Sequence, residues 1–129
     1  MPDNNIIHGL VAKGLGEGSK FLSMEHYKYE IKKQLGFIPY PGTLNIKIDP
    51  FQYDKLKEKN KVRIEGFIQE GKKFGGASCY LARIGGILGA VIIPDITKHG
   101  NDMIEFISDI KLREKLNLKD NDKVKIQLS

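Results

Sequence analysis

Apolar and polar residues alternate with a period of two in several short segments of this chain, a pattern typical of strands with one buried face. The clearest alternation runs over residues 43–48, where Leu44, Ile46 and Ile48 fall on one face. Further strands are predicted at residues 6–13, 62–65, 74–84, 87–93, 103–107 and 123–128. A hairpin turn at residues 70–72 is expected to lead into the 74–84 strand. So many short strands with few helices predict a small, mainly β barrel.

The predicted helices are few and short. Apolar residues recur every three or four positions over residues 24–35, which predicts an amphipathic helix that ends at Gly36. A short polar helical turn is expected over residues 52–59. A last short helix is expected over residues 110–116, with Asp109 placed to cap its first turn.

The composition is that of an ordinary globular protein, with 40% hydrophobic and 29% charged residues over 129 positions. A chain of this length buries about two-thirds of its unfolded surface, so residues 1–129 are expected to form a single domain. The one cysteine, Cys79, has no partner for an internal disulfide and is expected to pack rather than react. No apolar stretch approaches the roughly 18 residues of a membrane span, and the start lacks a secretion signal, so a cytoplasmic location is expected.

The net charge of +5, from 21 basic and 16 acidic residues, favours an anionic partner. A nucleotide, a nucleic acid and a membrane surface all meet that description. The basic residues are interleaved with acidic ones rather than gathered together, so the lysines equally suit a role in solubility. Charge alone leaves these alternatives open.

Three glycines follow the first predicted strand within five residues, at Gly14, Gly16 and Gly18. Because these residues have no Cβ atoms, the backbone amides of such a loop can approach a phosphate chain closely. Lys13 and Lys20 flank the loop and can add positive charge. The segment lacks the Gly-Lys-Ser/Thr of a P-loop, and its third glycine comes too early for a dinucleotide fingerprint. A glycine-rich hairpin connection is the alternative interpretation.

Thr43 and Asn45 share the polar face of the strand predicted over residues 43–48, where alternate side chains stand about 7 Å apart. Their uncharged oxygens suit Mg²⁺ when the phosphates of a substrate supply the remaining ligands. The alternative is that both residues simply belong to the solvated side of a half-buried strand.

The C-terminal part of the chain carries more candidate polar contacts. Thr97 and Glu105 are able to hydrogen-bond a polar ligand, although isolated polar residues of this kind are commonly plain surface. Lys111 and Glu114 stand one helical turn apart, as in a routine surface ion pair. Arg113 is able to grip a phosphate or stack on a ring.

Taken together, these segments resemble one family, the archaeal-type CTP-dependent riboflavin kinases. The resemblance runs in order from about residue 6 to residue 128, and it is carried by residues 14–18, residues 41–45, Ile93 and Pro94 with Thr97 and Glu105, and residues 111–114. It implies a six-stranded cradle-loop (RIFT-type) β-barrel with a few short helices. It also implies an enzyme that transfers the γ-phosphate of CTP to the 5′-hydroxyl of riboflavin, giving FMN and CDP.

The same resemblance implies roles for individual residues. Thr43 and Asn45 would bind Mg²⁺. Thr97 and Glu105 would contact the flavin, with Glu105 the candidate to orient or deprotonate the hydroxyl. The residues implied to bind the nucleotide are Gly14, Leu15, Gly16, Glu17, Gly18, Ser19, Lys111, Leu112, Arg113 and Glu114. Lys20 departs from the family pattern, which leads us to expect an aromatic residue there. The protein is expected to act as a monomer on CTP and riboflavin, without a nucleic-acid or membrane partner.

Two other functions compete with this interpretation. Residues 113–124 are similar to the end of swapped-hairpin DNA-binding regulators of the AbrB type, and the net charge of +5 suits a phosphate backbone. Those regulators are much shorter, however, and nothing in them requires the glycine loop or the Thr-x-Asn strand. A flavin-binding or nucleotide-binding protein without turnover is the second alternative.

Overall fold

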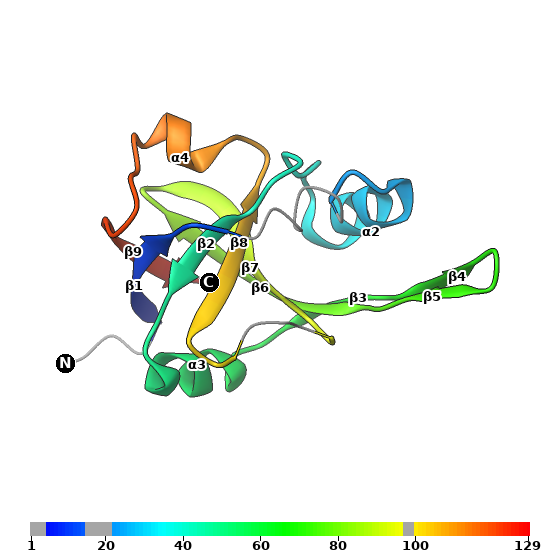
Figure 1. Cartoon of the computed structure of the whole chain (residues 1–129), viewed down its shortest axis with the longest axis horizontal. Helices are drawn as coiled ribbons and strands as arrows, with labels where there is room; N and C mark the ends of the chain where they lie inside the picture. The colour runs from blue at the N-terminus through cyan, green and yellow to red at the C-terminus, as the bar shows by residue number, and fades with distance from the viewer. Residues whose placement is uncertain (1–4, 15–21, 97–99) are drawn as a thin grey trace.

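A closed antiparallel β-barrel forms the centre of the molecule (Figure 1). The computed structural model describes residues 5–14, 22–96 and 100–129, and within them it has nine strands and three helices. Six strands follow one another around the barrel in the order β6-β7-β8-β2-β1-β9, and pairing of β9 with β6 closes it. The barrel strands are β1 (Ile6–Ala12), β2 (Leu44–Lys47), β6 (Ala77–Ile84), β7 (Ile87–Pro94), β8 (Met103–Ser108) and β9 (Lys123–Leu128). The predicted mainly β barrel is therefore confirmed.

The barrel interior is filled by the apolar residues that the alternation pattern identified. Leu44, Ile46 and Ile48 are all buried in the cluster that occupies the interior. Val124, Ile126 and Leu128 of β9 reach the same cluster from the other side of the closed sheet. The opposite faces of β2 and β9 therefore point away from the interior, because successive side chains of a strand alternate between its faces.

A second apolar cluster lies between the outside of the barrel and α2 (Glu25–Leu35). The helix buries Tyr27, Ile31 and Leu35, which are spaced as the helical periodicity predicted. It ends where expected: Gly36 adopts φ 89°, a conformation that glycine tolerates best, and its N–H donates to the Lys32 carbonyl at 3.0 Å. Buried residues of three barrel strands, among them Cys79, Ala90 and Ile107, complete this cluster.

A two-stranded arm projects from the barrel (Figure 1). Its base is β3 (Val62–Ile64), which pairs with β6, and its outer part is the hairpin of β4 (Phe67–Gln69) and β5 (Lys72–Phe74). The predicted turn at residues 70–72 is confirmed, with positive φ at both Glu70 and Gly71. The predicted continuous strand over 74–84 is wrong, because the chain leaves the ladder at Gly75 and Gly76 and separates β5 from β6.

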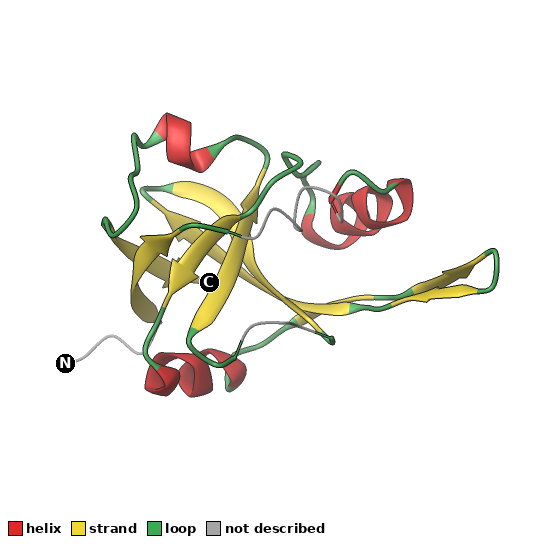
Figure 2. Ribbon diagram, in the orientation of Figure 1, coloured by secondary structure: helices red, strands yellow, loops and turns green. Residues whose placement is uncertain are grey.

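Two short helices lie at opposite ends of the barrel (Figure 2). The expected turn over residues 52–59 is a helix, α3 (Pro50–Lys57), which begins earlier because the Asp49 carboxylate accepts from the Phe51 N–H at 2.9 Å. The other, α4 (Leu112–Lys115), is shorter than predicted, and its expected cap at Asp109 is wrong. Lys111 holds the capping position without a side-chain bond, since the turn before it is closed by the Ser108 hydroxyl, which donates to the Ile110 carbonyl at 2.6 Å.

The described residues include no helix that is both long enough and apolar enough to span a membrane.

Candidate active site

The barrel register brings together polar residues that are far apart in the chain. Asn45 lies opposite Ala12 of β1 on one side and opposite Glu105 of β8 on the other. Residues that face each other in this way have Cβ atoms about 5 Å apart and can interact directly. The neighbours of Glu105 in sequence, Ile104 and Phe106, are buried in the barrel, so the glutamate points outward with Asn45.

Thr43 joins these two residues at the start of β2. Its hydroxyl donates a hydrogen bond to Oε1 of Glu105 at 2.9 Å. The bond takes up the hydroxyl proton and leaves the oxygen lone pairs of Thr43 available to a ligand. A predicted metal ligand and a predicted flavin contact are therefore directly linked, although they lie 62 residues apart in sequence.

Asn45 is not the solvated residue that a half-buried strand would carry at this position. It is only 8% exposed, although it lies on the outer face of the barrel. The chain at Gly14 covers it: a Cβ built on Gly14 would overlap Nδ2 of Asn45 and stand 2.9 Å from its Cγ. The two motifs singled out in the sequence thus meet at this contact, and only a residue without a side chain fits there.

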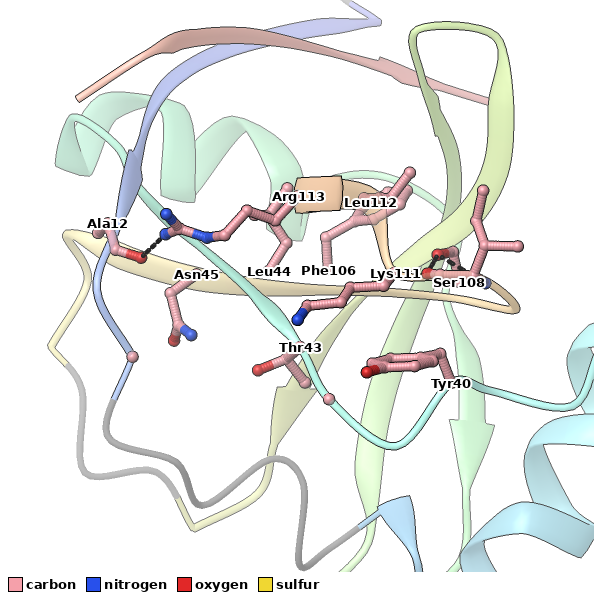
Figure 3. Close-up of a pocket in the computed structure, with 13 residues that line it drawn as sticks. Ala12, Tyr40, Thr43, Leu44, Asn45, Phe106, Ser108, Lys111, Leu112 and Arg113 are labelled. Atoms are coloured by element: carbon pink, nitrogen blue, oxygen red, sulfur yellow. Dashed lines mark hydrogen bonds between the residues drawn. The ribbon is translucent and has the colours of Figure 1, made fainter. Parts of the chain in front are cut away.

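Gly14, Thr43 and Asn45 line a pocket of about 260 Å³ (Figure 3). Its wall includes Ala12 and Gly14, Tyr40 and Gly42, and Thr43 and Asn45. The remaining lining residues are Leu44, Phe106, Ser108, Ile110, Lys111, Leu112 and Arg113. Most of the wall formed by the described residues is uncharged, and the two cations among them, Lys111 and Arg113, come from the segment around α4.

Arg113 ties α4 to the end of β1. Its Nη2 donates to the Ala12 carbonyl at 3.3 Å and to the Asp120 carboxylate at 2.7 Å. The bond thereby holds α4 against the end of β1, two residues before Gly14. The side chain of Leu112 is buried in the barrel core, so a nucleotide contact at this residue would be made by its backbone.

Lys111 lines the pocket, whereas Glu114 does not. The surface ion pair expected between them is not formed in the described part of the chain, whose ion pairs join Lys28 to Glu25, Arg63 to Asp95 and Arg113 to Asp120. In Figure 3 the Lys111 side chain extends over the pocket instead. Its ammonium group is therefore available to an anionic ligand.

The donor set fits a divalent cation that arrives with a substrate. Among the described residues, no three histidines, cysteines or carboxylates gather into a metal site. Thr43 and Asn45 offer neutral oxygens on the pocket wall, and the Glu105 carboxylate accepts from Thr43 and lies opposite Asn45 in the strand register. Mg²⁺ accepts such a partial set when phosphates and water complete its coordination.

Several predicted site residues lie outside the described part of the chain. They are Leu15, Gly16, Glu17, Gly18 and Ser19 of the glycine loop, together with Thr97. Lys20 also lies there. Their roles in binding the nucleotide and the flavin stay predictions.

Cys79 packs as predicted. It is fully buried on β6, and burial raises the pKa of its thiol to about 12.

Tyr40, Ser108 and Ile110 also form part of the pocket wall, and no sequence pattern predicted them. Tyr40 stands between two prolines in an irregular segment, where no periodicity reports which way a side chain points. Ser108 closes the turn before α4 and also accepts the Tyr40 N–H through its carbonyl at 2.7 Å. The Pro-Tyr-Pro-Gly sequence, residues 39–42, was the available sign of a fixed aromatic residue beside the strand that carries Thr43 and Asn45.

Fold and pocket together define a class of protein: a closed cradle-loop β-barrel with a small pocket in which Thr43, Asn45 and Lys111 lie close to Gly14. Comparison with known proteins narrows this class. The family model of the CTP-dependent riboflavin kinase domain, described as domain of unknown function DUF120, matches residues 11–128. The chain therefore belongs to this family, which confirms the resemblance stated from its motifs.

Curated relatives from archaea agree with this placement. A riboflavin kinase of Methanosarcina mazei is 42% identical over 130 residues, which cover 98% of this chain and 58% of the relative. A riboflavin kinase of Pyrobaculum aerophilum is 44% identical over 123 residues, covering 93% of this chain and 59% of the relative. For a riboflavin kinase of Archaeoglobus fulgidus the identity is 42%, with 95% of this chain and 54% of the relative covered. The chain thus spans somewhat more than half the length of these relatives. None of these matches favours a DNA-binding regulator.

Proposed function

We propose that this chain is a riboflavin kinase that transfers the γ-phosphate of CTP to the 5′-hydroxyl of riboflavin, giving FMN and CDP. One observation carries the proposal: Gly14, Thr43 and Asn45 line one pocket with Lys111 extending over it, and the Thr43 hydroxyl links this pocket to the carboxylate of Glu105. The Asn45 carboxamide is buried and only a glycine fits beside it, at Gly14. Neither a DNA-binding role nor a plain position on the protein surface explains this arrangement. The choice of CTP over other nucleotides rests on the family alone.

The pocket suits the phosphates of a nucleotide. Gly14 begins the glycine segment beside Asn45, and Lys111, whose side chain extends over the pocket, supplies a positive charge. Thr43 and Asn45 would hold Mg²⁺ that arrives with the nucleotide. Bound there, the ion would neutralise charge on the phosphates during transfer. Phosphoryl transfer asks little covalent chemistry of the protein, so positioning and charge stabilisation are its main tasks.

Glu105 is the residue proposed to position the hydroxyl of riboflavin. One of its carboxylate oxygens accepts from Thr43, and a carboxylate has a second oxygen to accept from another hydroxyl. In the reaction the riboflavin oxygen forms a bond to the γ-phosphorus while the bond from that phosphorus to the β–γ bridging oxygen breaks. The hydroxyl proton passes to Glu105 or to solvent, and CDP leaves with the bridging oxygen. Glu105 would orient this hydroxyl or accept its proton.

Turnover with different donors tests the proposal. The purified protein is incubated with riboflavin and Mg²⁺ in the presence of CTP, ATP, GTP or UTP, and FMN is separated from riboflavin by chromatography. FMN formed with CTP supports the kinase. If FMN appears with none of the four nucleotides, the kinase proposal is rejected, and a binding protein without turnover becomes the better account.

We also propose that residues 1–129 form one kinase domain that acts as a monomer. The family match over residues 11–128 supports one domain. Light scattering on the purified protein is expected to give the monomer mass of 14.5 kDa. Twice that mass at working concentration would contradict the monomer.

A further inference from the structure

Tyr40 is the one aromatic ring with an exposed face among the described residues of the pocket wall. It is 36% exposed, whereas Phe106, the other aromatic residue in this wall, is 1% exposed and belongs to the barrel core. Figure 3 shows the Tyr40 ring nearly edge-on, with its hydroxyl end turned toward Thr43. The ring therefore borders the space where the phosphates and the cation are proposed to lie, yet nothing in the chemistry described above uses it.

The backbone of Tyr40 is fixed on both sides. Its N–H donates to the Ser108 carbonyl at 2.7 Å, and its carbonyl accepts from the Gly42 N–H at 2.8 Å. Pro39 and Pro41 flank it, and a following proline restricts a residue to extended conformations. A Cβ on Gly42 would stand 3.2 Å from Cε1 of the ring, so the ring edge rests against this glycine. An exposed aromatic side chain held this firmly loses little freedom when a ligand packs on it.

The space around Tyr40 suits a flat group. The described walls enclose about 260 Å³, which is below the usual size of a pocket for one drug-sized ligand, so a nucleotide and a flavin cannot both lie inside it. Tyr40 also lines a shallow groove that runs outside the pocket past Lys32, Phe37 and Asp109. The tyrosine thus stands at the boundary between the pocket and open surface, where a ring attached to a phosphate or a ribityl chain would emerge.

We propose that Tyr40 is a stacking platform for the planar ring of a substrate, either the pyrimidine of the nucleotide or the isoalloxazine of riboflavin. This inference rests on the proposed function. Both rings present a π face of the kind that stacks on tyrosine, and they share this chemistry. Stacking of one nucleic-acid base on an aromatic side chain changes affinity by roughly 5- to 100-fold when the side chain is truncated, so the effect of losing Tyr40 is measurable.

Binding of each ligand by itself tests the platform and shows which ring it holds. Riboflavin binding is followed by the change in flavin fluorescence, and binding of CDP with Mg²⁺ is followed by calorimetry. Tyr40→Leu removes the ring, while Tyr40→Phe keeps it and removes only the hydroxyl. Tyr29→Leu is the matched control, because Tyr29 is 63% exposed on α2 and does not line the pocket. Should Tyr40→Leu fail to fold, Tyr40→Gln replaces it.

The expected result is specific to one ligand. Tyr40→Leu weakens either riboflavin or CDP binding by roughly 5- to 100-fold and leaves the other within twofold, whereas Tyr40→Phe and Tyr29→Leu bind both like the wild type. Unchanged binding of both ligands by Tyr40→Leu overturns the platform, and so does an equal loss of both. A wild-type protein that binds neither riboflavin nor CDP overturns the proposed function itself.

Discussion

Replacing Gly14 by alanine perturbs the contact on which the candidate site depends. The new Cβ would overlap Nδ2 of Asn45, and its distance of 2.9 Å from Cγ is well short of an ordinary carbon–carbon contact of about 3.5 Å or more. Gly14 has no positive φ, so alanine is compatible with the backbone, and the overlap is the only source of strain. The substitution therefore tests the contact between the two motifs rather than the freedom of the loop.

The size of the effect follows from this geometry. To relieve the overlap, the Asn45 carboxamide or the backbone of Gly14 has to move by about 1 Å, and a displacement of this size at a reacting centre costs about 100-fold in rate. Overpacking of a buried site costs about 1–3 kcal/mol of unfolding free energy, which lowers Tm by several degrees in a domain of this length. Without the overlap, replacing glycine by alanine would instead stabilise the fold by about 0.4–1 kcal/mol.

The assay is the initial rate of FMN formation at varied Mg²⁺ and CTP, together with thermal unfolding. For Gly14→Ala we expect a rate about 100-fold lower and a higher Mg²⁺ requirement, because the displaced carboxamide is the proposed ligand. Gly75→Ala is the matched control, since nothing lies within 4 Å of a Cβ at that position. Adding Asn45→Ala to Gly14→Ala should restore Tm but not activity. Wild-type rate and Mg²⁺ dependence in Gly14→Ala would refute the argument.

Three further results are expected. Thr43→Val combined with Asn45→Leu should abolish Mg²⁺-dependent FMN formation in a protein that still folds, because both proposed oxygen ligands are gone. Cys79 should resist iodoacetamide at pH 8 in the native state and react in denaturant, because burial raises its thiol pKa to about 12. Arg63 holds the pKa of Asp95 below its ordinary value of 3.8, chiefly through hydrogen bonds of 2.7 Å. A carboxyl with a lowered pKa adds stability above its unfolded pKa and loses it as pH falls through the folded value. In urea unfolding, Arg63→Met should thus cost under about 1 kcal/mol at pH 7, since both side chains are partly exposed, and less below pH 3.8.

Each of these results has a contrary outcome. Gln127→Leu, which removes an exposed carboxamide from the barrel strand β9, controls for the loss of a polar side chain and should keep full activity. Full activity of the Thr43–Asn45 double variant would remove the metal assignment. Rapid native labelling of Cys79 would show that the barrel wall opens readily at β6. If the loss of unfolding free energy caused by Arg63→Met stays the same or grows as the pH falls, the linkage to Asp95 is disproved.

Much of the fold was predictable because the core follows simple periodicity. Leu44, Ile46 and Ile48 alternate in sequence and lie in the barrel interior. Gly36 ends α2 in the left-handed conformation, as expected for a glycine at the end of a helix. Asp109 failed as a helix cap because the Ser108 hydroxyl closes the preceding turn, which shifts the first helical residue to Leu112. Local patterns do not show that a neighbouring hydroxyl, here that of Ser108, closes the turn at Ile110.

The site was predictable in its residue types but not in its contacts. Thr43 and Asn45 were expected to share a face of one strand. The burial of Asn45, however, depends on Gly14, which follows a different strand, β1. The hydrogen bond from Thr43 to Glu105 depends on the register between β2 and β8, which no local sequence pattern specifies. Tyr40 was missed for the same reason, since its place is set by a bond to Ser108 across the barrel end.

A structure of the protein with CDP, Mg²⁺ and riboflavin bound tests the central claim most directly. We expect the ion about 2.1 Å from Oγ1 of Thr43 and from Oδ1 of Asn45, with the diphosphate beside Gly14 and Lys111. Phosphates and ion found together at any other part of the barrel, with Thr43 and Asn45 contacting only protein, would contradict it.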